Sequence, residues 1–223
     1  MKCLKLSALI LCVALTPGAF AGVDGANAPG VAKAEVGTIA VARYRLDAGR
    51  SQFMVRAFAG GPLFFKGHDH FIKVGDFDGE AELTPGALSP ASLSLRVRAD
   101  SLEETRDVFT AQQKQIINKE LREIVLETAK YPEIIFKSTE VTVRALTGGQ
   151  FEAEVGGDLT LHGVTRHISI PATVTLSGGD LRARGEFTID RGDYNVKATS
   201  AVHGLVRVRG KLKFTFDIVA HPV

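Results

Sequence analysis

The chain has few or none of the residues on which several classes of protein depend. Its 223 residues include two cysteines, Cys3 and Cys12, and no tryptophan. Both cysteines lie within the first 21 residues, which we expect to be cleaved from the mature protein. The remaining chain then has no disulfide, no thiolate nucleophile and no cysteine ligand for a metal ion, so its stability must come from apolar burial.

Sequence motifs of catalysis are also missing. We find no G-x-S-x-G, no H-E-x-x-H and no phosphate-binding loop pattern, and no spacing links serine, histidine and aspartate as a triad. A site assembled from residues distant in the sequence would leave no such pattern. With no positive sign of chemistry, we predict that the protein is not an enzyme.

The chain also lacks an excess of charge. Lysine and arginine number 27 and aspartate and glutamate 25, and two of the bases, Lys2 and Lys5, belong to the expected leader. Without that leader the two signs cancel. A balanced surface without a basic block provides no electrostatic footprint for nucleic acid.

No hydrophobic run is long enough for a transmembrane helix, which needs roughly 20 residues. The stretch from Leu6 to Leu15 follows a positively charged start and precedes Ala19-Phe20-Ala21. This order is typical of a secretory signal peptide, so we expect residues 1–21 to be removed after Ala21. Residues 22–38, rich in glycine, alanine and proline, read as a flexible segment. One continuous domain over residues 39–223 should follow.

What the chain has in abundance is alternation of apolar and polar residues. Between Phe151 and His162 the odd-numbered apolar positions should face one way and the polar positions, His162 included, the other. Similar patterns predict strands near 39–47, 51–59, 75–84, 92–99, 133–145, 150–162, 166–177, 180–190 and 202–219. Asp47-Ala48-Gly49, Gly148-Gly149 and Gly178-Gly179 read as turns between strands.

One segment, from about Glu104 to Lys130, breaks this alternation. Its residues favour a helix whose apolar face comprises Ile117, Leu121, Ile124, Val125 and Thr128. Ser101 and Glu104 have the spacing of a capping box at its start. Antiparallel strands with a single helical insertion (about 104–130) favour an all-β, extended, lipocalin-like barrel of about eight strands over an immunoglobulin-like sandwich. The interior of such a barrel either is filled by side chains or holds a slender ligand.

Three ordered stretches resemble the YceI-like family. They are Gly157-Asp-Leu-Thr-Leu-His-Gly-Val-Thr-Arg-His-Ile-Ser-Ile-Pro171, Lys130-Tyr131-Pro132-Glu-Ile-Ile-Phe136-Lys-Ser138, and Phe187-Thr-Ile-Asp-Arg191-Gly-Asp193-Tyr194. Tyr44 to Val55 also looks like the family's opening hairpin. The resemblance covers about residues 42–219. It implies a lipocalin-like barrel of the bacterial periplasm that holds long isoprenoid chains, such as those of quinones, in an apolar lumen, and it permits a homodimer.

The resemblance makes the inward-facing apolar residues candidates for ligand contact. We expect a bound isoprenoid lipid or quinone and no required cofactor. A polyprenyl tail would bind by burial alone, at roughly 0.8 kcal/mol for each methylene. The candidate lining residues are Phe53, Val55, Phe77, Leu95, Val97, Phe136, Leu159, Leu161, Ile168, Ile170, Phe187, Phe214 and Phe216. A closed, packed core would use the same residues, so both interpretations of the interior stay open.

The segment Lys66-Gly67-His68-Asp69-His70-Phe71 departs from the family pattern, which more often has a Gly-Phe-Ser-like stretch. On a strand, His68 and His70 would project from one face, where they could share Zn²⁺ or Cu²⁺ with a third ligand from His162, His167 or His203. This metal-binding protein on the same barrel is the alternative function. The pair could equally form a polar cluster that hydrogen-bonds a ligand head group, or lie exposed beside a turn.

Overall fold

The computed structural model describes residues 41–84, 88, 91–197, 199–201 and 206–223. The predicted signal peptide (1–21), the predicted flexible segment (22–38) and His203 lie outside the described residues. No helix in the described part is both long and apolar enough to cross a membrane.

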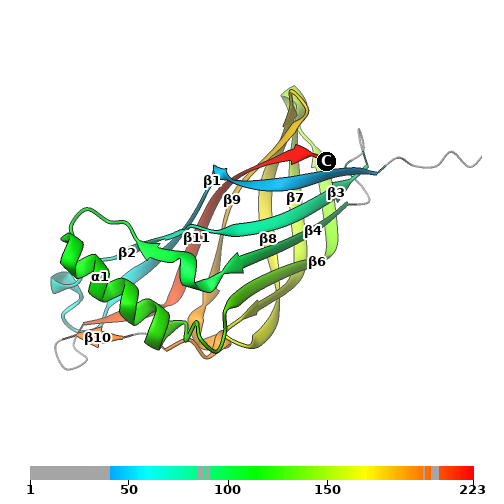
Figure 1. Ribbon diagram of the computed structural model, residues 1–223. Coiled ribbons are helices and arrows are strands. Elements are labelled where there is room, and N and C mark those ends of the chain that lie inside the picture. The colour runs from blue at the N-terminus through cyan, green and yellow to red at the C-terminus, as the bar shows by residue number, and fades with distance from the viewer. Residues whose placement is uncertain (1–40, 85–87, 89–90, 198, 202–205) are drawn as a thin grey trace, which may run out of the picture. The chain divides into compact units, whose positions relative to one another are not determined.

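Eight antiparallel strands form a closed barrel (Figure 1). Around the ring they follow the order β1 (Ala42–Gly60), β3 (Phe77–Leu83), β4 (Ala91–Arg98), β6 (Glu133–Ala145), β7 (Gln150–Leu161), β8 (Val164–Ser177), β9 (Asp180–Asp190) and β11 (Val206–Pro222). Strand β11 pairs with β1 along both lengths, from Tyr44 opposite Pro222 to Gly60 opposite Arg207, and closes the ring. The predicted lipocalin-like barrel of about eight strands is therefore confirmed.

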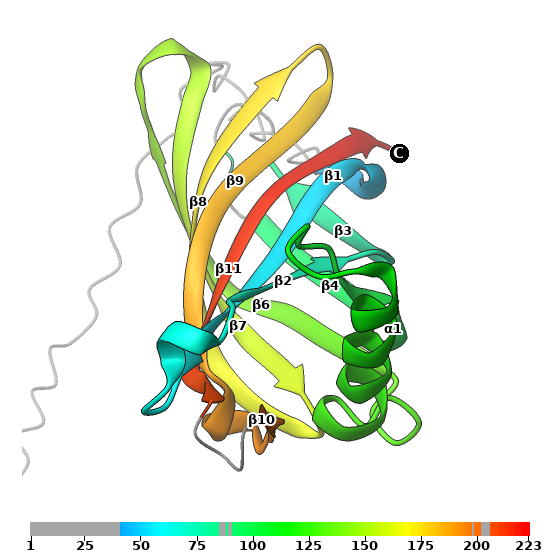
Figure 2. The same ribbon diagram turned by 90° about the vertical axis from the view of Figure 1, so that its left-hand side faces the viewer.

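Three short strands extend the sheet at one end of the barrel. Strand β2 (His70–Val74) pairs with β1, β5 (Leu102–Glu104) pairs with β2, and β10 (Ser200–Ala201) pairs with β11. In both Figure 1 and Figure 2, β10 and the helix α1 lie at this end, away from the C-terminus. Short 3₁₀ turns occupy Phe64–Lys66, Ala99–Ser101, Thr147–Gly149 and Arg191–Tyr194.

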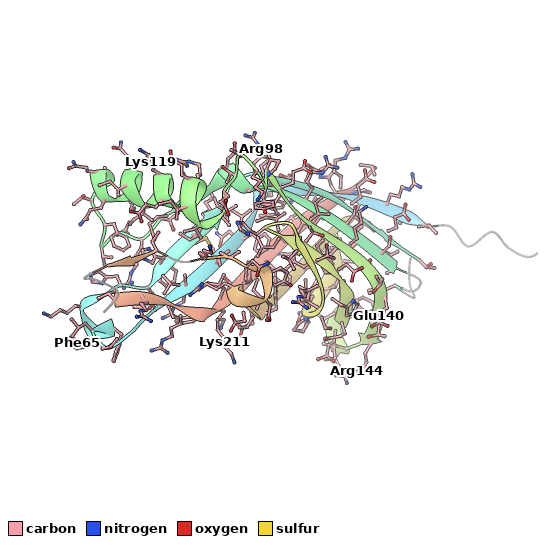
Figure 3. All side chains as sticks on the ribbon, turned by 90° about the horizontal axis from the view of Figure 1, so that it is seen from below. Phe65, Arg98, Lys119, Glu140, Arg144 and Lys211 are labelled. Atoms are coloured by element: carbon pink, nitrogen blue, oxygen red, sulfur yellow. The ribbon has the colours of Figure 1, made fainter. Side chains whose placement is uncertain are left out.

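The alternation places apolar side chains inside the barrel and charged ones outside. On β7, Ala153, Leu159 and Leu161 are buried while Glu152 and Glu154 are exposed, because successive side chains of a strand point to opposite faces. Charged side chains such as those of Arg98, Lys119 and Lys211 project outward (Figure 3).

The prediction that His162 lies on the wet face is wrong. Strand β7 ends at Leu161, and His162 and Gly163 form a two-residue turn with φ of 52° and 74°. Positive φ at both central positions is the geometry of a type I′ hairpin. At this turn the His162 side chain packs against Tyr131 and contacts Glu127, which leaves it 8% exposed.

The predicted opening hairpin around Asp47-Ala48-Gly49 is also wrong. Strand β1 continues through this segment, since the residues before and after it both pair with β11. The pairing register shifts between Asp47 and Gln52, so the segment is a bulge. Asp47 stabilises it by accepting hydrogen bonds from Arg50 N at its side chain and from Ser51 Oγ at its carbonyl. Turn-forming residues thus bend the strand without reversing it.

The helical insertion is present but shorter than predicted. Helix α1 spans Ala111–Glu120 and continues as one π-helical turn, Leu121–Val125. Thr110 caps it in a capping box with Gln113, so the predicted box of Ser101 and Glu104 is wrong. Glu104 instead is the last residue of β5, where it pairs with Ile72 of β2.

Candidate ligand-binding site

The barrel encloses an apolar cavity of about 290 Å³, which we call the lumen. On a comparable measure a single buried water needs roughly 10–15 Å³. Side chains therefore leave a space far larger than a water-sized void, and a fully packed interior does not fit this structure. The barrel has room for a slender ligand.

Twelve of the thirteen predicted residues line the lumen: Phe53, Val55, Leu95, Val97, Phe136, Leu159, Leu161, Ile168, Ile170, Phe187, Phe214 and Phe216. Phe77 is on the same inward face as its partner Val97 but does not line the cavity. It is 5% exposed, and its ring lies edge-on to Phe53 at a centroid distance of 6.2 Å, so it supports a lining residue. Whether the twelve contact a ligand stays a prediction.

Four phenylalanines from three neighbouring strands form one wall of the lumen. The rings of Phe187 and Phe214 stack with centroids 4.7 Å apart, and Phe53 and Phe216 pack around them. Gly185 lies opposite Phe216, and a Cβ there would come within 2.6 Å of the Phe216 ring. Because Gly185 has no side chain, the Phe216 ring can lie against the backbone of β9.

At the end of the barrel nearest the C-terminus, the lumen has an apolar closure. Ala220 pairs with both Leu46 and Leu181, which line the cavity. A second buried cluster comprising Tyr44, Leu83, Leu88, Leu181 and Ala220 packs at the same level, and Ala220 is fully buried. The closed end therefore presents only apolar surface to a ligand tail.

The helical segment covers part of the lumen wall. Ile117, Leu121 and Val125 line the cavity, as the predicted apolar face requires. Ile124, assigned to the same face, is 54% exposed, because the π turn after Glu120 rotates the positions that follow. Ile72 and Val74 on β2 also line the lumen. Sequence reasoning missed them, although their alternation with Lys73 was a usable signal.

Polar side chains reach the lumen only at the end formed by α1 and β10, as far as the described residues show. They belong to His70, Glu120, Arg191 and Thr199. His70 begins β2, opposite Ala57 of β1, and Ala57 in turn pairs with Leu212 of β11, ten residues before that strand ends. The lumen thus has one apolar end and one end with hydrogen-bonding groups.

His70 is held by a buried carboxylate. Its Nδ1 lies 2.7 Å from Oε2 of Glu104, whose side chain has no exposed surface. The other oxygen, Oε1, accepts from the N–H groups of Phe71 and Arg106 at 3.2 and 2.8 Å. Burial alone would raise the pKa of Glu104, but the hydrogen bonds from His70, Arg106 and Phe71 outweigh it and hold the pKa below its usual value.

The ring of Phe109 separates the two histidines of the predicted pair. It stacks on His70 with centroids 5.3 Å apart and meets His68 edge-on at 5.8 Å. His70 faces the lumen, whereas His68 lines a shallow polar pocket outside it together with Asp69 and Arg106. Asp69 accepts hydrogen bonds from Arg56 and from Ala59 N. The two imidazoles therefore contribute to different surfaces.

Neither proposed third ligand in the described part of the chain completes a metal site. His162 contacts Glu127 at 2.7 Å, and His167 contacts Asp158 at 3.2 Å on the outer face. The described residues contain no group of three or more histidine, cysteine, aspartate or glutamate side chains arranged for a metal ion. Metal binding by His68 and His70 stays a prediction.

Comparison with known proteins identifies a family model that spans most of the domain and curated relatives that match part of it. A model of the YceI-like domain matches residues 44–220. A UPF0312 protein of Pseudomonas savastanoi pv. phaseolicola is 39% identical over 103 residues, which are 42% of this chain and 50% of the relative. A UPF0312 protein of Vibrio cholerae is 34% identical over 104 residues, 47% of this chain and 49% of the relative. The chain spans about half the length of the curated relatives it matches.

Two solved structures share the fold. BcnA of Burkholderia cenocepacia aligns with a TM-score of 0.59 and 18% identity, covering 78% of this chain and 98% of BcnA. A polyisoprenoid binding domain from Saccharophagus degradans, implicated in plant cell wall breakdown, aligns with a TM-score of 0.58 and 18% identity, covering 81% of this chain and 98% of that domain. At this identity the likeness establishes the fold.

Proposed function

The chain belongs to the YceI-like family, and from this premise we propose that it binds an isoprenoid-like lipid in the barrel lumen and carries or sequesters it in the periplasm. The observation that carries the proposal is the apolar cavity of about 290 Å³, lined mainly by aliphatic and phenylalanine side chains and closed at one end by Ala220 and its neighbours. The polyisoprenoid binding domain of Saccharophagus degradans, which shares the fold, supports the same class of ligand.

The energetics of burial favour this class of ligand. At roughly 0.8 kcal/mol for each buried methylene, an isoprene unit gains on the order of 3 kcal/mol on leaving water. A few units therefore offset the entropy lost when a flexible tail is ordered. No hydrogen bond to the tail is needed, so the protein acts by binding and performs no chemistry of its own.

Export to the periplasm rests on the predicted signal peptide, whose residues the structure does not describe. N-terminal sequencing of protein recovered from the periplasm should show Gly22 as the first residue. A chain that stays in the cytoplasm with Met1 intact would contradict this part of the proposal.

Native mass spectrometry tests the binding itself. We expect protein purified from bacteria to carry an apolar adduct that extracts into organic solvent, with no stoichiometric metal by elemental analysis. A metal without an organic adduct would favour the alternative function. An unliganded mass that also fails to take up added geranylgeraniol would contradict lipid binding.

A pair of adjacent substitutions on β11 controls for folding. Phe214 faces the lumen, while Thr215 is exposed on the outer face. Phe214→Lys places a charge among apolar side chains and should abolish loading, whereas Thr215→Lys should load like the natural protein. If Phe214→Lys fails to fold, Ile170→Trp fills part of the same lumen without a charge. Equal loading of folded lumen and surface variants would rule out the lumen as the binding site.

A further inference from the structure

His70 is an unusual residue for its position in the lumen wall. It shares a face of β2 with Ile72 and Val74, because residues two apart on a strand point the same way. Both of these neighbours are apolar and buried. An aliphatic residue at position 70 would continue the wall, whereas an imidazole brings a polar ring to it.

The surrounding residues fix which nitrogen of His70 is available. The Glu104 carboxylate can only accept a hydrogen bond in its ionised form, so the nitrogen it contacts, Nδ1, carries a proton. Nε2 is therefore the ring nitrogen that is not used in this contact. Stacking on Phe109 also restricts rotation of the ring. A second, buried residue orients the imidazole, as partners of ligand-binding histidines commonly do.

This polar group lies at the end of the lumen where Thr199, Glu120 and Arg191 also reach the wall. The opposite end is closed by apolar side chains. A bound amphiphile gains most when its tail lies toward the apolar end and its head lies beside the polar groups. The arrangement therefore selects one direction of binding.

We infer that His70 Nε2 is the contact for the head group of the lumen ligand, and that this ligand is a long-chain amphiphile with a hydroxyl or carbonyl oxygen at its head. A hydroxyl donates to Nε2 when this nitrogen bears no proton, whereas a carbonyl oxygen accepts from Nε2–H when both ring nitrogens are protonated. The inference rests on the proposed lipid-binding function. Glu104 is a positioning residue in this arrangement, since it orients His70 and does not itself line the lumen. His68, which lies outside the lumen, has no part in it.

The test uses His70→Asn, because the asparagine amide can still donate to Glu104 from nearly the position of Nδ1 but has no atom in place of Nε2. His68→Asn is the matched control. Three probes are compared by displacement of a lumen-bound fluorescent dye: geranylgeraniol with a hydroxyl head, decylubiquinone with carbonyls, and the hydrocarbon phytane with neither. Thermal melting and circular dichroism establish that both variants fold.

We expect His70→Asn to weaken the binding of at least one oxygen-bearing probe about five- to tenfold, the range of one hydrogen bond, and to change that of phytane less than twofold. The probe that loses affinity identifies the head as hydroxyl or carbonyl. His68→Asn should leave all three unchanged. Equal effects of His70→Asn on all three probes would overturn the inference while leaving lipid binding intact. A natural protein that binds none of them would instead overturn the proposed function.

If His70→Asn does not fold, nitrogen-15 spectra of the natural protein provide the answer. The Nε2 resonance of His70 should shift on addition of geranylgeraniol or decylubiquinone but not of phytane. A resonance that none of these bound probes shifts would contradict the head-group contact.

Discussion

His162 Nε2 lies 2.7 Å from Glu127 Oε2, and both residues adopt a positive φ, 52° and 46°. A left-handed backbone costs a residue other than glycine roughly 1–2 kcal/mol, so surrounding contacts must hold both in place. The Tyr131 ring packs on His162 with centroids 4.3 Å apart. These contacts attach the end of the helical segment to the β7–β8 turn, and thereby position the helical part of the lumen wall.

The geometry of the β7–β8 turn predicts how substitution of its glycine, Gly163, changes the free energy of unfolding. Gly163 has a φ of 74°, and a Cβ there would lie 2.6 Å from the Tyr131 ring, whereas Gly148, with a φ of 72°, has open space around it. We expect Gly148→Ala to lower the free energy of unfolding by about 1 kcal/mol through its backbone alone. Gly163→Ala should cost about 1–3 kcal/mol more, because Tyr131 must shift. Urea unfolding measures both, and equal losses would show that the Tyr131 contact is relaxed without cost.

The buried Glu104 predicts a dependence of stability on pH. Its pKa in the folded protein lies below the usual value of 4.5. The ionised group therefore stabilises the fold fully above that value, and the contribution is lost as the pH falls through the lower, folded-state pKa. Asp217, whose pKa is lowered to about 2 by hydrogen bonds from Arg182 and Arg184, acts in the same direction over the range from 3.8 to about 2.

Glu104→Gln removes the first of these two contributions. At pH 7 the variant should have a lower melting temperature than the natural protein. As the pH falls from 4.5 to 3, the melting temperature of the variant should decrease less than that of the natural protein. Asp78→Asn, on the exposed outer side of β3, serves as the control. A Glu104→Gln profile parallel to that of the natural protein would mean that Glu104 does not titrate differently in the folded and unfolded states.

The closed end of the lumen predicts a limit on ligand length. Ala183 lines this end and pairs with Ile218. Ala183→Phe should fill the space available to the end of a tail, so binding of the C45 alcohol solanesol should weaken at least tenfold while the C20 alcohol geranylgeraniol keeps its affinity. Ala145→Phe, at an exposed position of β6, is the matched control. Equal losses for both alcohols would contradict a tail directed toward Ala183.

The alternative metal site makes a separate prediction. If His68 and His70 share a metal ion, dialysed protein should bind one equivalent of Zn²⁺ or Cu²⁺ that the double variant His68→Ala, His70→Ala loses. Because Glu104 already contacts Nδ1 of His70, a metal could use only Nε2 of that ring. Isothermal titration tests this directly. Binding that the double variant retains, or no binding at all, would remove the alternative.

A homodimer through an edge strand also stays a prediction. The barrel is closed, and within the described part of the chain β5 and β10, of three and two residues, end the order of the sheet. Two longer segments also lack a strand partner on one side: β6 beyond Lys137 on the side of β4, and β8 before Thr173 on the side of β9. The short edges of β5 and β10 support only weak strand addition, and the exposed charged residues Glu140, Arg144 and Arg166 oppose it along the longer segments of β6 and β8. Sedimentation velocity at micromolar concentration should therefore show a monomer. A dimer under these conditions would require a different interface.

Much of the barrel and most of its lining could be predicted because side chains on a strand alternate between its two faces, so every second residue points the same way. The parity of their neighbours alone predicted that Leu159 and Phe214 face inward, and both line the lumen. The same parity could not distinguish Phe77, which packs against Phe53, from residues that line the cavity. Parity reports which face a residue is on, but not which inward-facing residues border the open space.

The sequence by itself determined the class of fold, the family and the apolar character of the interior, since these follow from local alternation and from short ordered motifs. Only the tertiary structure decided that the interior is open, that the lumen has a polar and an apolar end, and that His70 and His68 face different surfaces. The contact of His70 with Glu104 joins residues 34 positions apart. No local pattern reports it, because the pairing of β2 with β5 brings the two side chains together.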